Sequence, residues 1–343
     1  MKMYIPALLS LALQISTPAQ AQVKYRAIDL GTLAGPHYSS IAWAINNAGQ
    51  AVGWSDSLAG GGRRGYIWAN GVMTDLGALG DHGSIAYDIN DSGQVVGLSE
   101  GPDGSVHAFL WENGVMRDLG VGQALGINNA GEVVGQSGSM GCLWRGGTCE
   151  YLYGVARAEA VNNLGEVVGN GPTGAVLWRN GSITVLAPPS TRGQPFDIND
   201  HGQVVGRMTV PGGYPRGFLW QDGTMLDLGT LPGGHRSQAF GINNLGQIVG
   251  WADTDEPGVS GRAFLWQNGV MTNLQTLLET GTQWSLRIAY AINDSGQIVG
   301  AGFPGPSAQH AFLLVPVFEL PSPMLFALGI AAVASARRRR CSK

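Results

Sequence analysis

The sequence predicts an all-β fold, a seven-bladed β-propeller of four-stranded antiparallel blades. Three observations lead to this prediction: a short motif that recurs seven times, strand-length apolar runs in every copy, and an N-terminal strand that matches the one missing from the last copy. Glycine is frequent, with 54 of 343 residues, about twice the usual share of roughly 7 per cent, so turns should be frequent. Apolar residues at 44 per cent and charged residues at 13 per cent exclude a disordered chain.

The recurring motif is Ile-Asn-Asn-x-Gly-Gln or a near variant. Its first two residues stand at Ile45-Asn46, Ile89-Asn90, Ile127-Asn128, Val161-Asn162, Ile198-Asn199, Ile242-Asn243 and Ile292-Asn293. Successive copies are 44, 38, 34, 37, 44 and 50 residues apart, which agrees with the propeller period of roughly 40 to 50 residues. Each copy should therefore form one blade.

The second copy illustrates the order of elements within a blade. A first strand over Ala86–Ile89 leads through a turn that ends in glycine to a second strand over Gln94–Gly97. A third strand, His107–Trp111, leads through Asn113-Gly114 to a fourth strand over Val115–Leu119. Asn-Gly is a strong signal for a type I′ hairpin turn. Such short apolar or alternating runs are typical of strands, and four of them make a blade.

The last copy lacks a fourth strand. It runs through Ala289–Ile292, Gln297–Gly300 and His310–Leu314 and then meets Pro316. Near the N-terminus, Arg26–Gly31 ends in Asp-Leu-Gly, as fourth strands of other copies do. We expect this strand to complete the last blade, because that would close the ring and leave no open sheet edge. The propeller should then span residues 22–317.

The N-terminal residues are typical of a secretory signal peptide. Lys2, an apolar run over Ile5–Ile15 and the sequence Ala19-Gln20-Ala21 give the three parts of such a signal within residues 1–21. We expect the mature chain to begin near Gln22.

The C-terminal residues 318–343 have three parts as well. Glu319 and Pro321 stand in Glu-Leu-Pro, an apolar run covers Met324–Ala336, and four arginines follow: Arg337, Arg338, Arg339 and Arg340. The run is shorter than the roughly 20 residues that cross a bilayer. This layout resembles the PEP-CTERM sorting segment of bacterial exported proteins, with Glu-Leu-Pro in place of the usual Pro-Glu-Pro. The resemblance implies export and exosortase-type sorting partners, transient inner-membrane contact through the tail, and an extracellular or cell-surface location.

Charge argues against nucleic acid as a partner. Loss of residues 1–21 and 324–343 would lower the Lys and Arg count from 20 to 14, against 24 acidic residues, for a net charge of about −10. Nucleic-acid binding needs a basic face. An acidic surface suits a soluble protein outside the cell, and we expect a monomer.

Three cysteines do not make a disulfide framework. Cys142 and Cys149 flank a Gly146-Gly147 turn, and a two-residue hairpin would place Cys142 opposite Tyr151 and Cys149 opposite Trp144. The two cysteines would then be diagonal neighbours. The sequence leaves open whether they form a disulfide after export or stay reduced.

A family resemblance rests on the third strands. His107-Ala108-Phe109 and His310-Ala311-Phe312, with the Ile-Asn-Asn and Trp-x-Asn-Gly elements, resemble the HAF-repeat family of bacterial extracellular proteins over residues 25–315. The resemblance implies an exported repeat protein with a β-propeller fold, and it carries over no catalytic residue.

The two faces of the predicted propeller differ in kind. Turns between strands 1 and 2 and between strands 3 and 4 share one face, the turn face, and are uniform from blade to blade. The remaining loops share the opposite face, the loop face, and vary: 15 residues separate Gly53 from Trp68, but 9 separate Gly135 from Trp144. We expect ligands to meet the loop face, because variable loops carry function more often than uniform turns do.

Aromatic and polar residues on the loop face are the candidate ligand-binding residues: His37, His82, His235, Trp54, Trp251, Asp56, Arg63, Asp253 and Arg262. They could stack on sugar rings or clamp a peptide. Trp54 and Trp251 share one repeat position, so packing between blades is the favoured interpretation for them. The three histidines could hold a metal, but hydrogen bonding to their local backbone is the simpler explanation. We predict no cofactor and no metal.

Other repeated residues are assigned structural roles. Six tryptophans share one repeat position in the third strand and should fill the core between blades: Trp68, Trp111, Trp144, Trp178, Trp220 and Trp266. His107 and His310 begin third strands and are expected to serve packing and edge solvation. The run Asp88–Gly93 is similar to the start of a calcium loop, but Ser99 stands where the last acidic ligand is needed, so we predict an Asn-capped turn.

Two classes of function remain. The first is an exported, non-catalytic binding or scaffold protein outside the cell, with a glycan, matrix polymer or protein as its ligand. The alternative is a secreted carbohydrate-active hydrolase or lyase that uses carboxylates such as Asp56 and Asp253 at the channel mouth. The sequence contains no paired-acid motif, and a fold alone does not establish an activity. We therefore predict the first class, with no catalytic residue.

Overall fold

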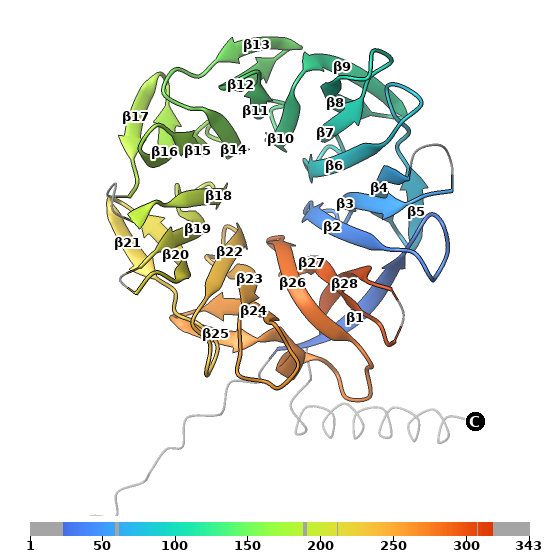
Figure 1. The fold of residues 1–343 in the computed structure, drawn as a ribbon, viewed down its shortest axis with the longest axis vertical. Helices are drawn as coiled ribbons and strands as arrows, with labels where there is room; N and C mark the ends of the chain where they lie inside the picture. The colour runs from blue at the N-terminus through green and yellow to red at the C-terminus, as the bar shows by residue number, and fades with distance from the viewer. Residues whose placement is uncertain (1–22, 59–61, 188–190, 211, 307, 318–343) are drawn as a thin grey trace, which may run out of the picture. The chain divides into compact units, whose positions relative to one another are not determined.

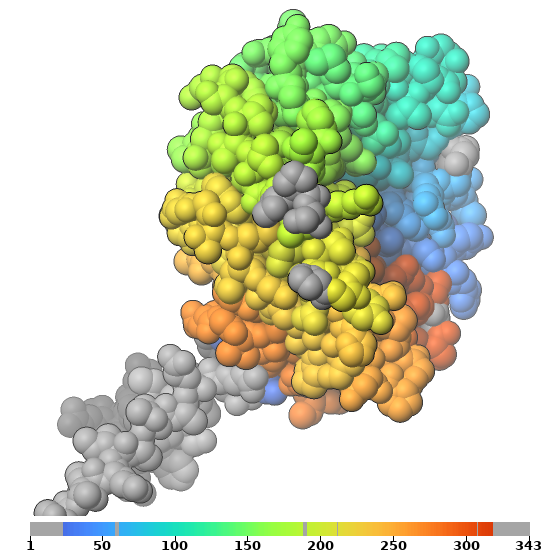
Figure 2. Space-filling view, turned by 60° about the vertical axis from the view of Figure 1, so that its left-hand side comes forward, coloured from blue at the N-terminus to red at the C-terminus, as the bar shows by residue number. Residues whose placement is uncertain are grey.

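The computed structural model describes residues 23–58, 62–187, 191–210, 212–306 and 308–317. Within them, seven four-stranded antiparallel sheets are arranged around a central axis (Figure 1). The predicted all-β fold, a seven-bladed β-propeller, is therefore confirmed. Tyr25–Val317 form one compact unit, and Figure 2 shows consecutive blades of this unit packed against one another in chain order.

Blades 1 to 6 each take four consecutive strands, ordered from the axis outward. Blade 1 comprises β2 (Ser40–Ile45), β3 (Ala51–Asp56), β4 (Arg63–Ala69) and β5 (Val72–Asp75). Blade 2 comprises β6 (Ser84–Ile89), β7 (Val95–Glu100), β8 (Val106–Glu112) and β9 (Val115–Val121). Blade 3 comprises β10 (Gln123–Ile127), β11 (Val133–Ser137), β12 (Met140–Arg145) and β13 (Thr148–Tyr151).

The next three blades repeat this order. Blade 4 comprises β14 (Arg157–Val161), β15 (Val167–Gly171), β16 (Gly174–Arg179) and β17 (Ser182–Val185). Blade 5 comprises β18 (Gln194–Ile198), β19 (Val204–Thr209), β20 (Pro215–Gln221) and β21 (Thr224–Asp227). Blade 6 comprises β22 (Ser237–Ile242), β23 (Ile248–Ala252), β24 (Arg262–Gln267) and β25 (Val270–Asn273), and a short 3-10 helix, η2 (Leu274–Leu277), follows it.

Blade 7 closes the ring with strands from both ends of the chain. Its order from the axis is β26 (Ser285–Ile292), β27 (Ile298–Phe303), β28 (His310–Val317) and β1 (Lys24–Gly31). Figure 1 shows β1 lying along β28. The N-terminal strand thus supplies the missing fourth strand, as the sequence predicts, and its buried Tyr25 and Leu30 belong to the cores on either side of the blade.

Seven separate hydrophobic clusters form the core, one between each pair of neighbouring blades. In five blades the third strand buries an aromatic ring completely: Tyr66, Phe109, Phe218, Phe264 and Phe312. Each ring lies opposite a glycine of the second strand, for example Phe109 opposite Gly97. A Cβ atom on Gly97 would lie 1.9 Å from the carbonyl oxygen of Ile85, so the ring and the first strand exclude any side chain there.

The six repeat tryptophans lie beside these rings. Trp68, Trp144, Trp178 and Trp220 are buried, whereas Trp111 and Trp266 are partly buried and pack against their clusters. Trp144 is the most buried of the six at 2 per cent exposure, and its indole Nε1 donates to the carbonyl oxygen of Leu119 in the preceding blade at 3.1 Å.

The hairpin turns follow the predicted chemistry. Asn113 and Gly114 both have positive φ, 50° and 84°, as a type I′ turn requires. Asn90 Oδ1 accepts from the backbone N–H groups of Ser92 and Gln94 at 3.1 and 3.0 Å, which confirms the Asn-capped turn.

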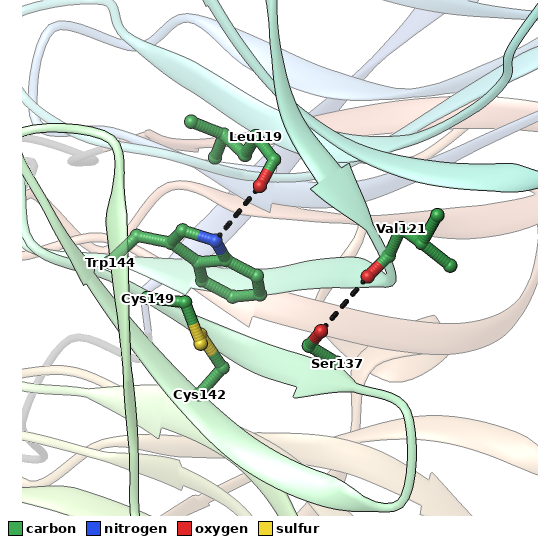
Figure 3. The surroundings of a disulfide bond; sticks show 6 residues. All are labelled: Leu119, Val121, Ser137, Cys142, Trp144 and Cys149. Atoms are coloured by element: carbon green, nitrogen blue, oxygen red, sulfur yellow. Dashed lines mark hydrogen bonds between the residues drawn. A yellow bond between two sulfur atoms is a disulfide. The ribbon is translucent and has the colours of Figure 1, made fainter.

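Cys142 and Cys149 form a disulfide, with their Cα atoms 5.7 Å apart (Figure 3). The hairpin has the predicted register, since Cys142 lies opposite Tyr151 and Trp144 lies opposite Cys149. Cys142 occupies the position that an aromatic ring takes in most other blades, and Figure 3 shows the bridge beside the Trp144 ring. The disulfide therefore joins the buried side of blade 3 to its outermost strand.

Two circles of hydrogen bonds close the turn face. Each motif asparagine is buried and donates Nδ2–H to the backbone carbonyl of its counterpart in the next blade at 3.0 to 3.1 Å, from Asn46 round the ring and back through Asn293. The residue after it donates its backbone N–H to the side chain of its own counterpart at 2.8 to 3.0 Å, again in an unbroken circle. The uniform turns thus join all seven blades.

The terminal segments fall outside this description. The predicted signal peptide, residues 1–21, and the sorting tail of residues 318–343 lie outside the described residues, as do Glu319, Pro321 and the four arginines. Among the residues that are described, no helix is long and apolar enough to cross a membrane.

Candidate binding site in the propeller channel

The innermost strand of every blade contains a bulge that sets one side chain at the channel. The ladder between the first and second strands shifts register at this point in all seven blades. A bulge changes the direction in which the side chain of the unpaired residue points. The seven bulged positions are occupied by Trp43, Tyr87, Leu125, Glu159, Phe196, Phe240 and Tyr290, and all seven line one cavity of about 320 Å³ together with Arg157 and Gln194. We call it the aromatic cavity.

Five of these side chains form a continuous arc of aromatic rings. Ring centroids are 6.4 Å apart for Tyr87 and Trp43, 4.2 Å for Trp43 and Tyr290, and 5.3 Å for both Tyr290–Phe240 and Phe240–Phe196. Interplanar angles lie between 35° and 56°, so the rings curve round the axis rather than stack. The arc extends over blades 2, 1, 7, 6 and 5, and gives the cavity one apolar side.

Blade 4 supplies the polar side of the cavity. Arg157 Nε lies 3.4 Å from Glu159 Oε2, and Asn170 Nδ2 donates to Glu159 Oε1 at 2.7 Å. Desolvation raises the pKa of the Glu159 carboxyl, and Arg157 and Asn170 act in the opposite direction. Opposite charges thus stand side by side. Gln194, whose Oε1 accepts from Arg207 Nε at 3.1 Å, lines the same cavity.

Two further carboxylates lie one residue beyond the bulge. Asp88 accepts from the backbone N–H groups of Ile89 and Ile127 at 2.8 Å, and Asp197 accepts from Ile198 and Ile242 at 2.8 and 2.9 Å. Each aspartate therefore joins two neighbouring blades. Both carboxylates are partly buried in the channel wall, and desolvation there raises the pKa of each to about 7.

The turn-face end of the channel holds a second, smaller cavity of about 160 Å³. It is lined by the motif Ile residues and by the side chains of the two hydrogen-bonded circles. Asn128 illustrates their use: its Oδ1 accepts from two backbone N–H groups of its own turn, and its Nδ2 donates to Asn162 and to Glu132. These polar groups are engaged in closing the ring.

The loop-face candidates of blade 1 pack against each other. Trp54 is buried at 7 per cent exposure, and the guanidinium carbon of Arg63 lies 3.9 Å from its ring centroid. Asp56 accepts from the backbone N–H of Ser39 at 2.9 Å. These contacts hold the strand ends of blade 1 together.

Blade 6 uses its candidates in the same way. Asp253 accepts from the backbone N–H groups of His235 and Arg236 at 2.7 and 2.6 Å. Arg262 is buried and forms two hydrogen bonds with Glu256 at 2.6 and 2.9 Å. Trp251 is partly buried and pairs with Gln238 and Ala263 across its neighbouring strands.

The three loop histidines are exposed: His37, His82 and His235. His235 stacks on Tyr214 with ring centroids 5.5 Å apart. Across the described ranges, no group of three or more His, Cys, Asp or Glu side chains is arranged to hold a metal ion. Neither channel cavity is lined by any of the nine loop-face candidates.

The histidines of the third strand have a more specific role than packing and edge solvation. His107 Nδ1 lies 2.8 Å from Asp118, and His310 Nδ1 lies 2.9 Å from Asp29. Both aspartates belong to the Asp-Leu-Gly ending of the fourth strand. Since the hydrogen bond with Asp118 raises the pKa of His107, the pair joins third and fourth strands most strongly when the histidine is protonated.

Sequence reasoning missed the aromatic cavity. Its bulged residues stand three positions before each motif asparagine, within the strand that the repeat makes innermost. Aromatic residues at five of seven equivalent positions were a usable signal, but a bulge is needed to set them at the channel, and a bulge has no signature in these strand sequences.

No protein-family model matches the sequence, and the comparison with curated proteins gave no match. Solved structures do match. A chain of the mitotic checkpoint complex has a TM-score of 0.50 at 11% identity, covering 91% of this chain and 100% of its own length. A puromycin-hydrolyzing peptidase of Mycobacterium tuberculosis has a TM-score of 0.52 at 11% identity, covering 87% of this chain and 57% of its own length.

The extracellular domain of a hybrid two component system of B. thetaiotaomicron has a TM-score of 0.48 at 10% identity, and 87% of this chain is covered. The chain spans only 40% of that protein and 57% of the peptidase. At these identities, the two likenesses with TM-scores of 0.50 and 0.52 bear on the fold alone.

Proposed function

We propose that the protein is an exported, non-catalytic propeller that acts outside the cell or at its surface as a binding or scaffold protein. Its ligand is a glycan, a matrix polymer or a surface protein. The observation that carries this proposal is the aromatic cavity, in which five contiguous rings face a charge-compensated Arg157–Glu159 pair. Binding cavities typically combine an apolar lining with a few placed polar groups.

Export has support from several independent features. The signal-peptide pattern of residues 1–21 and the PEP-CTERM-like tail with Glu319, Pro321 and Arg337 to Arg340 are both typical of exported proteins. The disulfide between Cys142 and Cys149 suits an oxidising compartment. The proposal includes exosortase-type processing of the tail and the HAF-repeat resemblance, and it excludes nucleic acid as a partner because the mature chain is acidic.

A non-catalytic role is favoured by how the carboxylates are used. Asp56 and Asp253, the acids considered for hydrolysis, accept hydrogen bonds from loop backbone. Asp88 and Asp197 hold backbone N–H groups with both of their oxygens. These bonds tie each carboxylate to the fold.

One observation favours the alternative, a carbohydrate-active hydrolase or lyase in the channel. A pKa of about 7 for Asp88 and Asp197 is the range in which a carboxyl group can serve as a general acid near neutral pH. The alternative would therefore use this pair of aspartates rather than Asp56 or Asp253.

A single experiment separates the two functions. The purified protein is applied to an array of glycans, extracellular polymers and surface proteins, and the soluble fraction is examined for released products by mass spectrometry. We expect saturable binding without products. Released products that disappear in the Asp88→Ala, Asp197→Ala double variant would establish the enzyme instead, and a protein that neither binds nor cleaves would contradict both functions.

A further inference from the structure

We infer that the aromatic cavity binds one neutral sugar ring at the end of a glycan chain, and that this ring enters from the loop face. The inference rests on the proposed binding function and specifies both its site and its ligand. It places the ligand-binding site at the bulged positions of the innermost strands, whereas the sequence alone favours loop-face residues such as Trp54 and Asp253.

The two sides of the cavity match the two sides of a pyranose. A sugar ring has a C–H face that packs on aromatic rings and a rim of hydroxyl groups that need hydrogen-bond partners. The arc from Tyr87 to Phe196 supplies aromatic surface over five blades. Arg157, Glu159 and Gln194 supply donors and acceptors on the remaining side. Such a lining orients the ligand, because only one placement satisfies both sides.

Charge in the cavity favours a neutral ligand. Arg157 and Glu159 lie 3.4 Å apart and offset each other. The next carboxylates, Asp88 and Asp197, already accept two backbone hydrogen bonds each, and their raised pKa leaves them partly protonated near neutral pH. A uronic acid that pairs with Arg157 would also meet Glu159 beside it, and an amine that pairs with Glu159 would also meet Arg157, so neither gains a net attraction. The hydroxyl groups of a neutral sugar can accept a hydrogen bond from Arg157 and donate one to Glu159.

Unused hydrogen-bonding capacity points to a ligand as well. Trp43 Nε1 is a buried atom that has no hydrogen-bond partner among the described residues, and the buried Arg157 Nε has only the 3.4 Å ion pair with Glu159. Buried donors of this kind are rare and need an explanation. Both belong to the lining of the aromatic cavity, on opposite sides, so a sugar between them could accept from each.

The size of the cavity and its opening toward the loop face favour the end of a glycan chain as the ligand. The cavity volume of about 320 Å³ is at the lower end of the range for ligand pockets, roughly 300 to 1,000 Å³. Arg157 and Gln194 begin their strands on the loop-face side. At the opposite end of the channel, the motif asparagines and their neighbours enclose only about 160 Å³. A single terminal ring fits a cavity that narrows in this way better than an internal segment of a polymer does.

The position of the chain ends is compatible with this direction. Strand β28 runs from the loop face to the turn face, and β1 begins at the turn face. Tyr25 and Val317 therefore both lie toward the turn face, opposite the mouth of the aromatic cavity.

The test uses isothermal titration of the purified chain with methyl glycosides of neutral hexoses and deoxyhexoses, of a uronic acid and of an amino sugar. Three variants are compared: Trp43→Ala and Glu159→Gln in the cavity, and Trp54→Ala on the loop face as the matched control. We expect millimolar binding of at least one neutral glycoside, weakened about tenfold or more by each cavity variant and unchanged by the control. Circular dichroism melts confirm that each variant is folded.

The outcomes separate this inference from the proposed function. Glycan binding that survives both cavity variants and is lost in Trp54→Ala overturns the cavity as the site but keeps the protein as a binder. Preference for the uronic acid or the amino sugar overturns the neutral ligand. Binding to proteins alone overturns the sugar and retains the broader function. Absence of binding to every glycan, polymer and protein tested overturns both.

Discussion

At the scale of single residues, Asp88 and Asp197 combine two opposing effects. Each carboxylate satisfies two backbone N–H groups of neighbouring blades, yet the channel wall desolvates it and raises its pKa to about 7. Blades 1, 4 and 7 place alanine at the same position, Ala44, Ala160 and Ala291. The fold does not require the carboxylate, and its presence gives the channel a group that titrates near neutrality.

We predict an unusual pH dependence of stability from these two aspartates. Their folded pKa of about 7 exceeds the unfolded value of 3.8, so the folded state holds the proton more tightly. Their contribution is therefore fully present below about pH 4 and is lost as pH rises to about 7. A change in pKa from 3.8 to about 7 corresponds to about 4 kcal/mol per group. Urea unfolding between pH 4 and pH 8 measures it. An Asp88→Ala, Asp197→Ala variant should have the flatter profile, and equal slopes for both proteins would contradict the assignment.

Trp144 should be the most costly of the six repeat tryptophans to remove. It is 2 per cent exposed and donates a hydrogen bond to Leu119 of the preceding blade, whereas Trp111 is only partly buried. Trp144→Ala should lower the free energy of unfolding by about 3 to 5 kcal/mol, the usual cost of emptying a buried aromatic site. Trp111→Ala should cost clearly less. Thermal and urea melts of the two variants would measure the difference, and equal losses would disprove this ranking.

At the scale of the strand, close packing around Gly97 explains why most second strands have glycine after two apolar residues, as in Val-Val-Gly. Any Cβ atom on Gly97 would meet the carbonyl oxygen of Ile85 at 1.9 Å and the Phe109 ring at 2.8 Å. The bulged innermost strand and the buried ring both approach this residue. The same bulge sets Tyr87 at the channel, so the glycine, the buried ring and the cavity side chain form one arrangement.

Gly97→Ala should therefore be strongly destabilising. Overpacking of this kind usually costs about 1 to 3 kcal/mol, and contact with two rigid groups places the expected loss at the upper end of that range. Gly217→Ala in β20 is the matched control, because its nearest neighbour atom is the backbone nitrogen of Ala239 at 3.3 Å. Urea unfolding should separate the two variants, and a Gly97→Ala protein as stable as the control would exclude the packing described for this strand.

Strands and turns were predictable because their signals are local. The Asn113-Gly114 hairpin, the Asn-capped turn at Asn90 and the register of Cys142 and Cys149 all follow from neighbouring residues. The disulfide itself remained open because register alone does not decide it. The channel site depends instead on a bulge at Trp43 and its equivalents, and on packing across seven blades, so residues that looked functional on the loop face, such as Trp54 and Asp253, were favoured over it.

At the scale of the whole molecule, the ring is closed three times. Strand β1 completes blade 7, and two circles of hydrogen bonds join the turns from Asn46 to Asn293 and from Asn47 to Asp294. Tyr25 and Leu30 of β1 fill the cores on both sides of blade 7. The two cores beside blade 7 therefore depend on both ends of the described chain.

Removal of residues 22–31 should open the ring. We expect a lower melting temperature and self-association through the exposed edge of β28, because an unpaired edge strand can pair with another chain. Size-exclusion chromatography with light scattering measures the association. A synthetic peptide of residues 23–33 should restore the monomer and the melting temperature. A truncated chain that remains monomeric with an unchanged melt would show that the hydrogen-bonded circles suffice.

The closure of blade 7 also determines how the molecule would resist a mechanical load. The chain leaves the propeller from β28, which lies between β27 and β1 rather than at the sheet edge. A force applied along this strand through Val317 would act on two antiparallel ladders at once and in shear, so many hydrogen bonds would have to fail together. A chain that left from the outermost strand could be peeled away one bond at a time. The shared blade thus makes the point where the chain leaves β28 hard to unravel.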